Sequence, residues 1–326
     1  MTPPPFAVIT AGAVHAVLDG AEPEVTALVE SAYRLHGLGR TVNPPSHFLR
    51  FPDRPSARII ALPASVGGDV DVHGLKWISS FPTNGAHGLP RASAVLILND
   101  AETGYPFACL ESATISSART AASAALAADH LTRSRPRPTR VGFVGTGVIA
   151  RQIHTYLAGT GWKFEEIGVF DTSPAAAAAF AEGAVVHDSA ESLIRSSDLI
   201  VFATVAGTPH VHDPSWFAHN PVVLHVSLRD LSPEVVLSAV NVVDDVDHCL
   251  KADTSPHLAE QRVGNRDFVD GTLYDVLTDT LAIPADRPVI FSPFGLGVLD
   301  LVLAKHVHER ASATGALHTV PDFFTP

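Results

Sequence analysis

Hydrophobic and polar residues follow two different spacings along the chain. In roughly the first third, short apolar runs alternate with turn-forming residues, which predicts a mostly antiparallel sheet. The strands expected in this part are Phe6–Ile9, Arg58–Pro63, Val72–Phe81, Arg91–Leu98 and Pro106–Leu110. A helix is expected at Pro23–Leu35, and the segment Arg40–Pro55 is expected to be turn-rich.

From Thr114 to Leu131 the apolar residues change to helical spacing, with small alanines on one face. The next segment, Thr132–Thr139, is rich in Pro and Arg and favours a domain boundary. Beyond it, apolar strand patterns alternate with helical ones, which is typical of a parallel doubly wound sheet. These strands are expected at Arg140–Val144, Glu166–Phe170, Leu199–Thr204, Val222–Val226 and Asn241–Val243.

A late strand and a glycine-rich turn at Pro288–Gly297 lead into a helix expected at about Val298–Ala311. We expect this helix to return to the first domain. The pattern therefore predicts an α/β chain of two domains. Residues 132–299 form a Rossmann doubly wound parallel sheet domain, and residues 1–131 with 300–326 form a discontinuous α+β domain that binds substrate.

The strand Arg140–Val144 ends in a glycine loop, Gly145-Thr146-Gly147, with Ala150 three residues further on. A first glycine allows the tight turn, a second lets a pyrophosphate approach the backbone, and a small third residue lets the helix pack on the sheet. The N-terminus of the following helix offers unpaired N–H groups and the positive end of its dipole. The loop predicts dinucleotide binding, and the alternative is a glycine-rich βα turn that binds no ligand.

Asp171 ends the second strand of this domain, where an acid can bind the ribose hydroxyls of a dinucleotide. No Arg or Lys follows in Thr172-Ser-Pro174 to receive a 2′-phosphate, so the sequence favours NAD over NADP. A helix-capping role for Asp171 is the alternative.

Composition narrows the function classes. The net charge of −12 argues against nucleic-acid or anionic-membrane partners, which would repel the chain. The two cysteines, Cys109 and Cys249, have no ligand-like neighbours and are expected to be small buried residues of a reduced, cytoplasmic protein. The start of the sequence lacks the pattern of a signal peptide, and no apolar run reaches membrane-spanning length.

The many histidines raise the question of a metal site. The close pairs are His210 with His212 and His306 with His308, and neither has a carboxylate or third histidine at ligand spacing. We expect no metal and interpret these histidines as solvated or locally hydrogen-bonded.

Three charged residues are candidates for chemistry beside a nicotinamide. Lys76 lies inside an apolar strand, where burial would lower its pKa and suit a proton donor or carboxylate clamp; an outward-pointing lysine is the alternative. Asp230 follows a parallel strand, which suits a general base or a loop-capping residue. Arg119 lies near the start of an Ala-rich helix and would face either solvent or the cofactor phosphates.

Several segments resemble the ornithine cyclodeaminase/μ-crystallin family, and within it the branch of 2,3-diaminopropionate biosynthesis dehydrogenases. The resemblance covers nearly the whole chain. It is carried by Lys76-Trp-Ile-Ser-Ser-Phe-Pro82, Gly88–Asp100, Thr103–Pro106, Ile115-Ser-Ser-Ala-Arg-Thr-Ala-Ala-Ser123, His225-Val-Ser-Leu-Arg-Asp-Leu231 and Ser292-Pro-Phe-Gly-Leu-Gly-Val-Leu-Asp300.

The resemblance implies roles for individual residues. Lys76 and an upstream arginine, matched by Arg50 with Arg54 as its rival, would hold the substrate carboxylate. Arg119 would contact a cofactor phosphate, and Asp230 would activate water. Further residues that would line the cofactor are Arg91, Thr204, Ser227 and Phe294.

The implied reaction is NAD-dependent oxidative hydrolysis of N-(1-amino-1-carboxy-2-ethyl)glutamate to 2,3-diaminopropionate and 2-oxoglutarate, for siderophore or peptide-antibiotic precursors. A homodimer built by the N-terminal sheet is implied as well. The alternatives are ornithine cyclodeamination, imine reduction, or a non-catalytic crystallin-like protein. The cyclodeaminase alternative is weakened because Arg229-Asp-Leu-Ser-Pro-Glu234 departs from the Gly-Asp-x-x-Gly-Lys run of those enzymes. Glu111-Ser-Ala-Thr114 also departs from the Glu-Gly-Ser run of close relatives.

Overall fold

The computed structural model describes residues 5–324. Its internal contacts divide the chain into two compact units, one formed by the residues up to Arg119 together with those from Leu296 onward, the other by Thr120–Gly295. The boundaries therefore differ from the predicted ones at 131/132 and 299/300.

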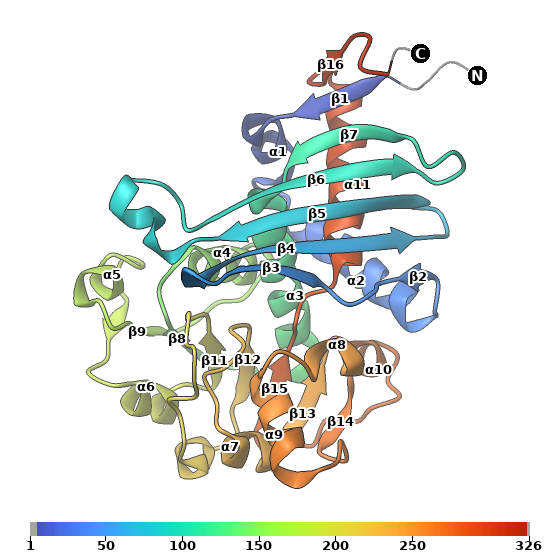
Figure 1. Cartoon of the computed structure of the whole chain (residues 1–326). Helices are drawn as coiled ribbons and strands as arrows, with labels where there is room; N and C mark the ends of the chain where they lie inside the picture. Colours follow the sequence, from blue (N-terminus) through green and yellow to red (C-terminus); the bar gives the residue numbers. More distant parts are fainter. Residues whose placement is uncertain (1–4, 325–326) are drawn as a thin grey trace. The chain divides into compact units, whose positions relative to one another are not determined.

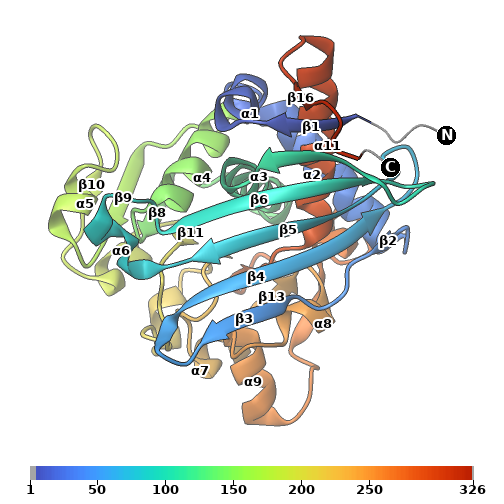
Figure 2. The ribbon, with the colours of Figure 1, turned by 45° about the horizontal axis from the view of Figure 1, so that its top comes forward.

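The first unit is a sheet with helices on one face (Figures 1 and 2). Its strands are β1 (Phe6–Ile9), β2 (Thr41–Val42), β3 (His47–Phe51), β4 (Arg54–Val66), β5 (Val72–Ser80), β6 (Ala92–Asp100), β7 (Pro106–Glu111) and β16 (His318–Val320). Its helices are α1 (Ala11–Leu18), α2 (Glu22–Gly37), the short 3₁₀ turn η1 (Pro82–His87), α11 (Gly297–Ala313) and the start of α3 (Ala113–Leu131).

The strands of this sheet follow the order β16-β1-β7-β6-β5-β4-β2, with β3 paired to β4. Neighbours in the run from β4 to β7 are antiparallel, which confirms the predicted meander. Helix α11 runs across β4, β5 and β6 in both ribbon views (Figures 1 and 2). Gly74 on β5 allows this approach, because a Cβ there would lie 2.7 Å from a methyl group of Leu301.

The prediction of a turn-rich segment at Arg40–Pro55 is wrong in part. That segment contains β2 and β3, and His47–Arg50 pairs residue by residue with Arg58–Ala61 on β4. β3 is short and its apolar residues do not alternate clearly, so its structure depends on the long neighbouring strand rather than on a local pattern.

The second unit is a parallel sheet with helices, as the alternating pattern predicted. Its strands are β8 (Arg140–Val144), β9 (Glu166–Phe170), β10 (Val185–Val186), β11 (Leu199–Phe202), β12 (Val222–His225), β13 (Val240–Val243), β14 (Val269–Thr272) and β15 (Val289–Ser292). Its helical segments, besides the rest of α3, are α4 (Val148–Gly159), α5 (Pro174–Ala178), α6 (Ala190–Ser196), η2 (Pro214–Phe217), α7 (Pro233–Leu237), α8 (Val246–Cys249), α9 (Ser255–Val263) and α10 (Leu273–Leu277).

The strand order of the second unit is β10-β9-β8-β11-β12-β15-β13-β14. The chain proceeds from β8 to one side through β9 and then returns to the other side through β11. This is the topological switch point at which Rossmann-type sheets bind ligands, outside the carboxyl ends of the strands. The predicted Rossmann fold is confirmed.

The polar segment after α3 belongs to the second unit and is not a free linker. The Arg135 guanidinium donates hydrogen bonds to the carbonyl oxygens of Asn220 (2.7 Å) and Pro284 (2.5 Å). Most of α3 from Ala121 onward is also buried. Composition predicted a boundary here because Pro and Arg are typical of linkers, whereas the guanidinium contacts tie this segment to its neighbours.

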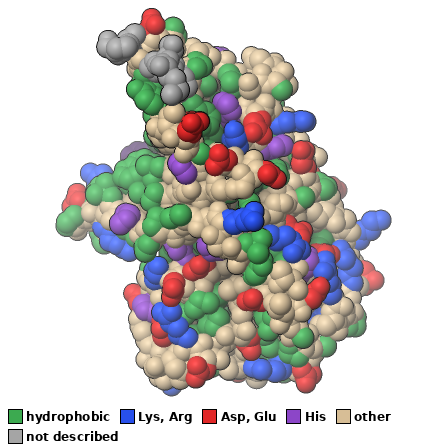
Figure 3. Space-filling view, turned by 90° about the vertical axis from the view of Figure 1, so that its right-hand side faces the viewer, with side chains coloured by type: hydrophobic (Ala, Val, Ile, Leu, Met, Phe, Trp, Pro, Cys, Tyr) green, Lys and Arg blue, Asp and Glu red, His purple; other side chains and the backbone are tan. Residues whose placement is uncertain are grey.

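No helix in the described part of the chain is long and apolar enough to span a membrane. On the face drawn in Figure 3, acidic and basic side chains are interspersed.

Candidate active site

The glycine loop has the backbone that a bound pyrophosphate requires. Gly145 has φ +87°, and a Cβ there would lie 2.7 Å from the carbonyl oxygen of Ala203, the residue after β11. Gly147 faces open space, and it begins α4 without a side-chain cap. Ala150 is completely buried under the helix. The backbone N–H groups at the start of α4 are thus available to a phosphate.

Asp171 is bound to the same loop. Its Oδ2 accepts hydrogen bonds from the backbone N–H (2.8 Å) and hydroxyl (2.9 Å) of Thr146, and its Oδ1 accepts one from the Ser173 N–H (2.9 Å). Burial raises the pKa of this carboxyl, but these bonds outweigh it and lower the pKa overall. The cap of α5 is Ser173 and not Asp171. The carboxylate therefore stays ionised beside the loop, as ribose recognition needs.

In the first unit, Lys76 is at the centre of a buried ionic cluster, which we call the Lys76 cluster: Lys76, Asp300, Arg119 and Ser116. Lys76 Nζ donates to Asp300 Oδ2 at 2.6 Å and to Ser116 Oγ at 3.2 Å. Arg119 Nε donates to the other oxygen, Asp300 Oδ1, at 3.3 Å. Lys76 is 2% exposed and Asp300 is completely buried. Of the two orientations that the sequence left open for Lys76, the structure has the inward one.

Burial is the largest influence on the Lys76 ammonium. It lowers the pKa of Lys76 to about 8, with the Asp300 charge opposing the shift and the Arg119 charge adding to it. An ammonium has three N–H donors, and two are used within the cluster. Lys76 therefore remains mostly charged near neutral pH but releases its proton more readily than an ordinary lysine, which suits proton transfer or a clamp for an anion.

More cationic residues lie on the same face of the sheet as Lys76. Side chains alternate between faces, so Lys76 and Ser80 on β5 share one face. Ser80 pairs with Arg58 on β4, and Arg58 pairs with Arg50 on β3. Arg91 Nη1 also donates to Ser80 Oγ at 2.8 Å. Directly paired residues lie on the same face, so these arginines continue the positive region that begins at Lys76.

The two rival arginines have different surroundings. Arg50 is exposed, and its guanidinium lies 5.0 Å from the centroid of the Phe48 ring. Arg54 lies at the start of β4, is 66% exposed and is 3.5 Å from Asp53. Arg50 is thus on the Lys76 face with its charge open, whereas Arg54 has an acidic neighbour beside it. The phosphate contact expected of Arg119 stays a prediction.

In the second unit, Asp230 is the centre of another cluster, which we call the Asp230 cluster: Asp230, Thr204, Ser227, His210 and His225. Asp230 Oδ1 accepts from the Thr204 hydroxyl and lies 3.0 Å from His210 Nε2. Asp230 Oδ2 accepts from the Ser227 hydroxyl and lies 3.3 Å from His225 Nε2. Thr204 and His210 follow β11, His225 is the last residue of β12, and Ser227 and Asp230 follow β12. All five therefore lie at the carboxyl edge of the sheet, where ligands bind.

Hydrogen bonds decide the ionisation of Asp230. Burial alone raises the pKa of this completely buried carboxyl, but the bonds from His210, His225 and Ser227 outweigh burial and hold the pKa well below its usual range. Thr204 and Ser227, predicted to line the cofactor, are thus also donors to Asp230.

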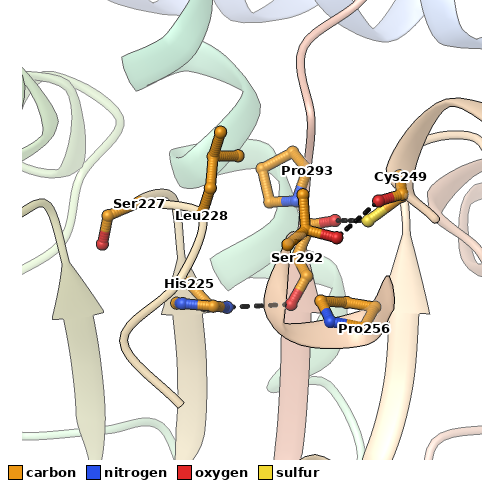
Figure 4. Close-up of a pocket in the computed structure, with 8 residues that line it drawn as sticks. His225, Ser227, Leu228, Cys249, Pro256, Ser292 and Pro293 are labelled. Atoms are coloured by element: carbon orange, nitrogen blue, oxygen red, sulfur yellow. Dashed lines mark hydrogen bonds between the residues drawn. The ribbon is translucent and has the colours of Figure 1, made fainter. Parts of the chain in front are cut away.

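One side of the Asp230 cluster borders a pocket, shown in Figure 4. The His225 ring points toward Ser292, with Nδ1 3.2 Å from the hydroxyl oxygen. Cys249 Sγ donates to the Ser292 carbonyl oxygen at 3.1 Å, and burial raises the pKa of this thiol, so Cys249 is an inert structural residue. The other lining residues are Ser227, Leu228, Thr254, Pro256 and Pro293.

The loop that carries Phe294 is fixed by a second buried carboxyl. Asp244 accepts a hydrogen bond from the Gly295 N–H at 2.7 Å, and burial raises the pKa of Asp244 to about 6. The Phe294 ring lies edge-on to His248 at 5.4 Å between centroids. The role of Phe294 at the cofactor stays a prediction.

Sequence reasoning missed some of the groups that complete these clusters. Asp300 and His225 lie in segments that carry the family resemblance, but the sequence predicts no role for either residue. The sequence predicts a solvated or locally hydrogen-bonded His210, whereas its Nε2 lies 3.0 Å from Asp230, 20 residues further along the chain. In the described residues no group of His, Cys, Asp and Glu could hold a metal ion. The sequence signal for Asp300 was an acid placed in the apolar start of α11, where an acid needs a buried partner.

The parallel sheet, its switch point, the glycine loop and the bound carboxylate define the second unit as a Rossmann-type dinucleotide-binding domain. The chain belongs to the ornithine cyclodeaminase/mu-crystallin family, whose model matches residues 13–315. The family resemblance found in the sequence is therefore confirmed.

Individual relatives span most of the chain. The N-((2S)-2-amino-2-carboxyethyl)-L-glutamate dehydrogenase of Staphylococcus aureus is 28% identical over 78% of this chain and 79% of its own. The crystal structure of CmnK is 32% identical and has a TM-score of 0.89 over 98% of this chain and 99% of its own. An archaeal alanine dehydrogenase dimer with bound NAD is 27% identical, with a TM-score of 0.86 over 98% and 99%. The predicted cofactor, NAD, agrees with this last structure.

Proposed function

We propose that the protein is an NAD-dependent oxidoreductase that cleaves a secondary amine by oxidative hydrolysis. Its proposed substrate is N-(1-amino-1-carboxy-2-ethyl)glutamate, and its products are 2,3-diaminopropionate and 2-oxoglutarate. The Staphylococcus aureus relative, named for the same type of substrate, supports this proposal.

The proposed class of substrate, one with several carboxylates, rests on the positively charged residues that lie on the same face of the sheet as Lys76. Arg50, Arg58 and Arg91 continue the positive charge that begins at Lys76. The proposed substrate has three carboxylates, whereas alanine and the cyclic imines of related reductases have one. Arginine binds carboxylates through a fixed fork of donors, so several arginines in a row favour a substrate with several carboxylates.

We assign substrate binding to residues of the first unit and water activation to the Asp230 cluster. Arg50 and the remaining N–H of Lys76 hold carboxylates, and the low exposure of Lys76 keeps this contact away from water, which strengthens it. Bound NAD supplies the hydride acceptor for the substrate Cα–H. The Asp230 cluster then activates the water that hydrolyses the resulting imine. Its charged carboxylate at the carboxyl edge of the sheet supports this role.

The same-family alternatives make different predictions. Ornithine cyclodeamination recycles NAD and forms no net NADH, while an imine reductase consumes NADH with cyclic imines. The segment Arg229–Glu234 lacks the lysine of the cyclodeaminase run, which supports the dehydrogenase. A non-catalytic protein would bind NAD and turn nothing over.

The test is NADH formation, followed by absorbance, with the aminocarboxyethyl-glutamate substrate, with alanine and with ornithine. NADH is expected from the first substrate, together with equal amounts of 2-oxoglutarate. Absence of NADH from that substrate would refute the proposal, and NADH from alanine alone would assign the chain to alanine oxidation.

We also propose a homodimer that forms through the open face of the first-unit sheet. Trp77 on β5 pairs with Ala61 and Val95 on the neighbouring strands, all on the face opposite Lys76. Trp77 and Val95 are 40% and 42% exposed, so the face presents apolar side chains without cover. Light scattering is expected to give a dimer, and Trp77→Glu is expected to give a monomer.

A further inference from the structure

The Asp230 cluster contains two histidines, and their surroundings differ. His225 is 1% exposed, and both of its ring nitrogens have partners, Ser292 Oγ at Nδ1 and Asp230 at Nε2. His210 has a side chain that is 39% exposed, and its Nε2 is bound to Asp230 Oδ1. Its Nδ1 is not used in any of the hydrogen bonds of the cluster. Only one of these two histidines therefore offers a ring nitrogen to a ligand.

Asp230 is poorly suited to take a proton from water itself. A carboxylate has about four acceptor positions. Those of Asp230 face Thr204 and His210 on one oxygen and Ser227 and His225 on the other. The carboxylate has no exposed surface, and its lowered pKa makes it a weak base. Asp230 is thus built to remain an anion that orients its neighbours.

The contact with Asp230 also determines the tautomer of His210. An ionised carboxylate only accepts hydrogen bonds, so Nε2 of His210 must carry the proton. In the neutral ring, Nδ1 then has a free electron pair. The backbone holds the residue in place, because the N–H groups of His210 and Val211 both donate to the Asp230 carbonyl oxygen at 3.0 Å. A base oriented in this way by a carboxylate is the arrangement used by Asp-His pairs in hydrolytic enzymes.

We propose that His210 Nδ1 takes the proton from the attacking water in the hydrolytic step and that Asp230 is the positioning residue for His210. This inference rests on the proposed function. The water oxygen bonds to the imine carbon while its proton passes to Nδ1, and the electron pair of the C=N bond moves to nitrogen. His210 returns this proton to that nitrogen, which gives a carbinolamine. His210 then takes the remaining hydroxyl proton and passes it to the same nitrogen while the C–N bond breaks and the electron pair of the O–H bond forms C=O. The amine leaves as 2,3-diaminopropionate, and the oxygen remains in 2-oxoglutarate.

The experiment separates the hydride step from hydrolysis by rapid mixing of substrate and NAD with the full-length protein. His210→Gln keeps an amide that can donate to Asp230 but has no base. It is expected to form NADH in a first turnover close to the wild-type rate, equal in amount to the sites. The following steady-state rate is expected to fall roughly 10²-fold or more. His210→Ala is expected to recover part of the steady-state rate when imidazole is added.

His212→Gln is the matched control, because His212 is an exposed histidine two residues away and outside the cluster. It is expected to behave as wild type in both phases. Equal steady-state rates in His210→Gln and wild type would overturn the inference, and so would loss of the first-turnover NADH with native folding by circular dichroism. If wild type itself forms no NADH, the proposed function fails, which is a different result.

Discussion

Each unit of the protein has a completely buried aspartate at the centre of a polar cluster, but the groups bound to the two carboxylates are of different kinds. Asp300 in the Lys76 cluster binds two cations, an ammonium and a guanidinium. Asp230 accepts from two hydroxyls and lies within hydrogen-bond distance of two imidazole nitrogens. The first arrangement cancels charge, and the second keeps a negative charge and orients the donors around it. The difference indicates that one cluster supports the fold and presents a cation, whereas the other directs proton transfer.

The largest expected effect is on turnover and tests the second cluster. Asp230→Asn removes the anion that fixes the tautomer of His210, so the steady-state rate of NADH formation is expected to fall about 10³-fold or more. Unfolding in urea is expected to show a loss of only about 1–2 kcal/mol, since asparagine keeps the shape of the side chain and one acceptor oxygen, so only part of the hydrogen bonding is lost. A variant that keeps its turnover would contradict the role of Asp230.

The first cluster should respond in the opposite way, with stability as the main loss. Asp300→Asn leaves the Lys76 and Arg119 cations together without an anion, which is expected to cost about 3–5 kcal/mol in the free energy of unfolding. The double variant Asp300→Asn/Lys76→Met is expected to recover part of that loss. A loss below about 1 kcal/mol for Asp300→Asn would show that the cluster contributes little to folding.

A pH series sharpens the same comparison. The pKa of Lys76 falls from 10.5 to about 8 on folding, so between these values the unfolded chain binds more protons. The contribution of Lys76 to the free energy of unfolding therefore rises as pH increases from about 8 to 10.5, by on the order of 3 kcal/mol at most. The difference between the unfolding free energies of wild type and Lys76→Met measures it. A difference that does not change over this range would contradict the prediction.

The smallest expected effect concerns the edge of the positive region. Arg50→Gln is expected to raise KM for the tricarboxylate substrate about tenfold, through loss of one charged hydrogen bond. Arg54→Gln is the matched control and is expected to change KM less, because Asp53 lies beside Arg54. An equal rise in KM for the two variants would contradict the prediction that Arg50, and not Arg54, binds a substrate carboxylate.

Much of the fold followed from local patterns. The alternation of strands and helices after residue 139 predicted the parallel sheet, and β8 and β9 begin and end at the predicted residues. Gly145, Gly147 and Ala150 were identified because each meets a local steric requirement of the βα turn. Such requirements act between residues that are close in sequence, so the sequence alone expresses them.

The sequence by itself thus determined the fold class and the glycine loop, and it left two orientations open for Lys76. Only the tertiary structure decided which groups share a cluster. Asp300 meets Lys76 across 224 positions of sequence, and His210 meets Asp230 across 20. Hydrogen bonds and ion pairs act over a few ångströms in space regardless of sequence separation, so no spacing pattern could show that Asp230 holds a histidine while Asp300 holds two cations.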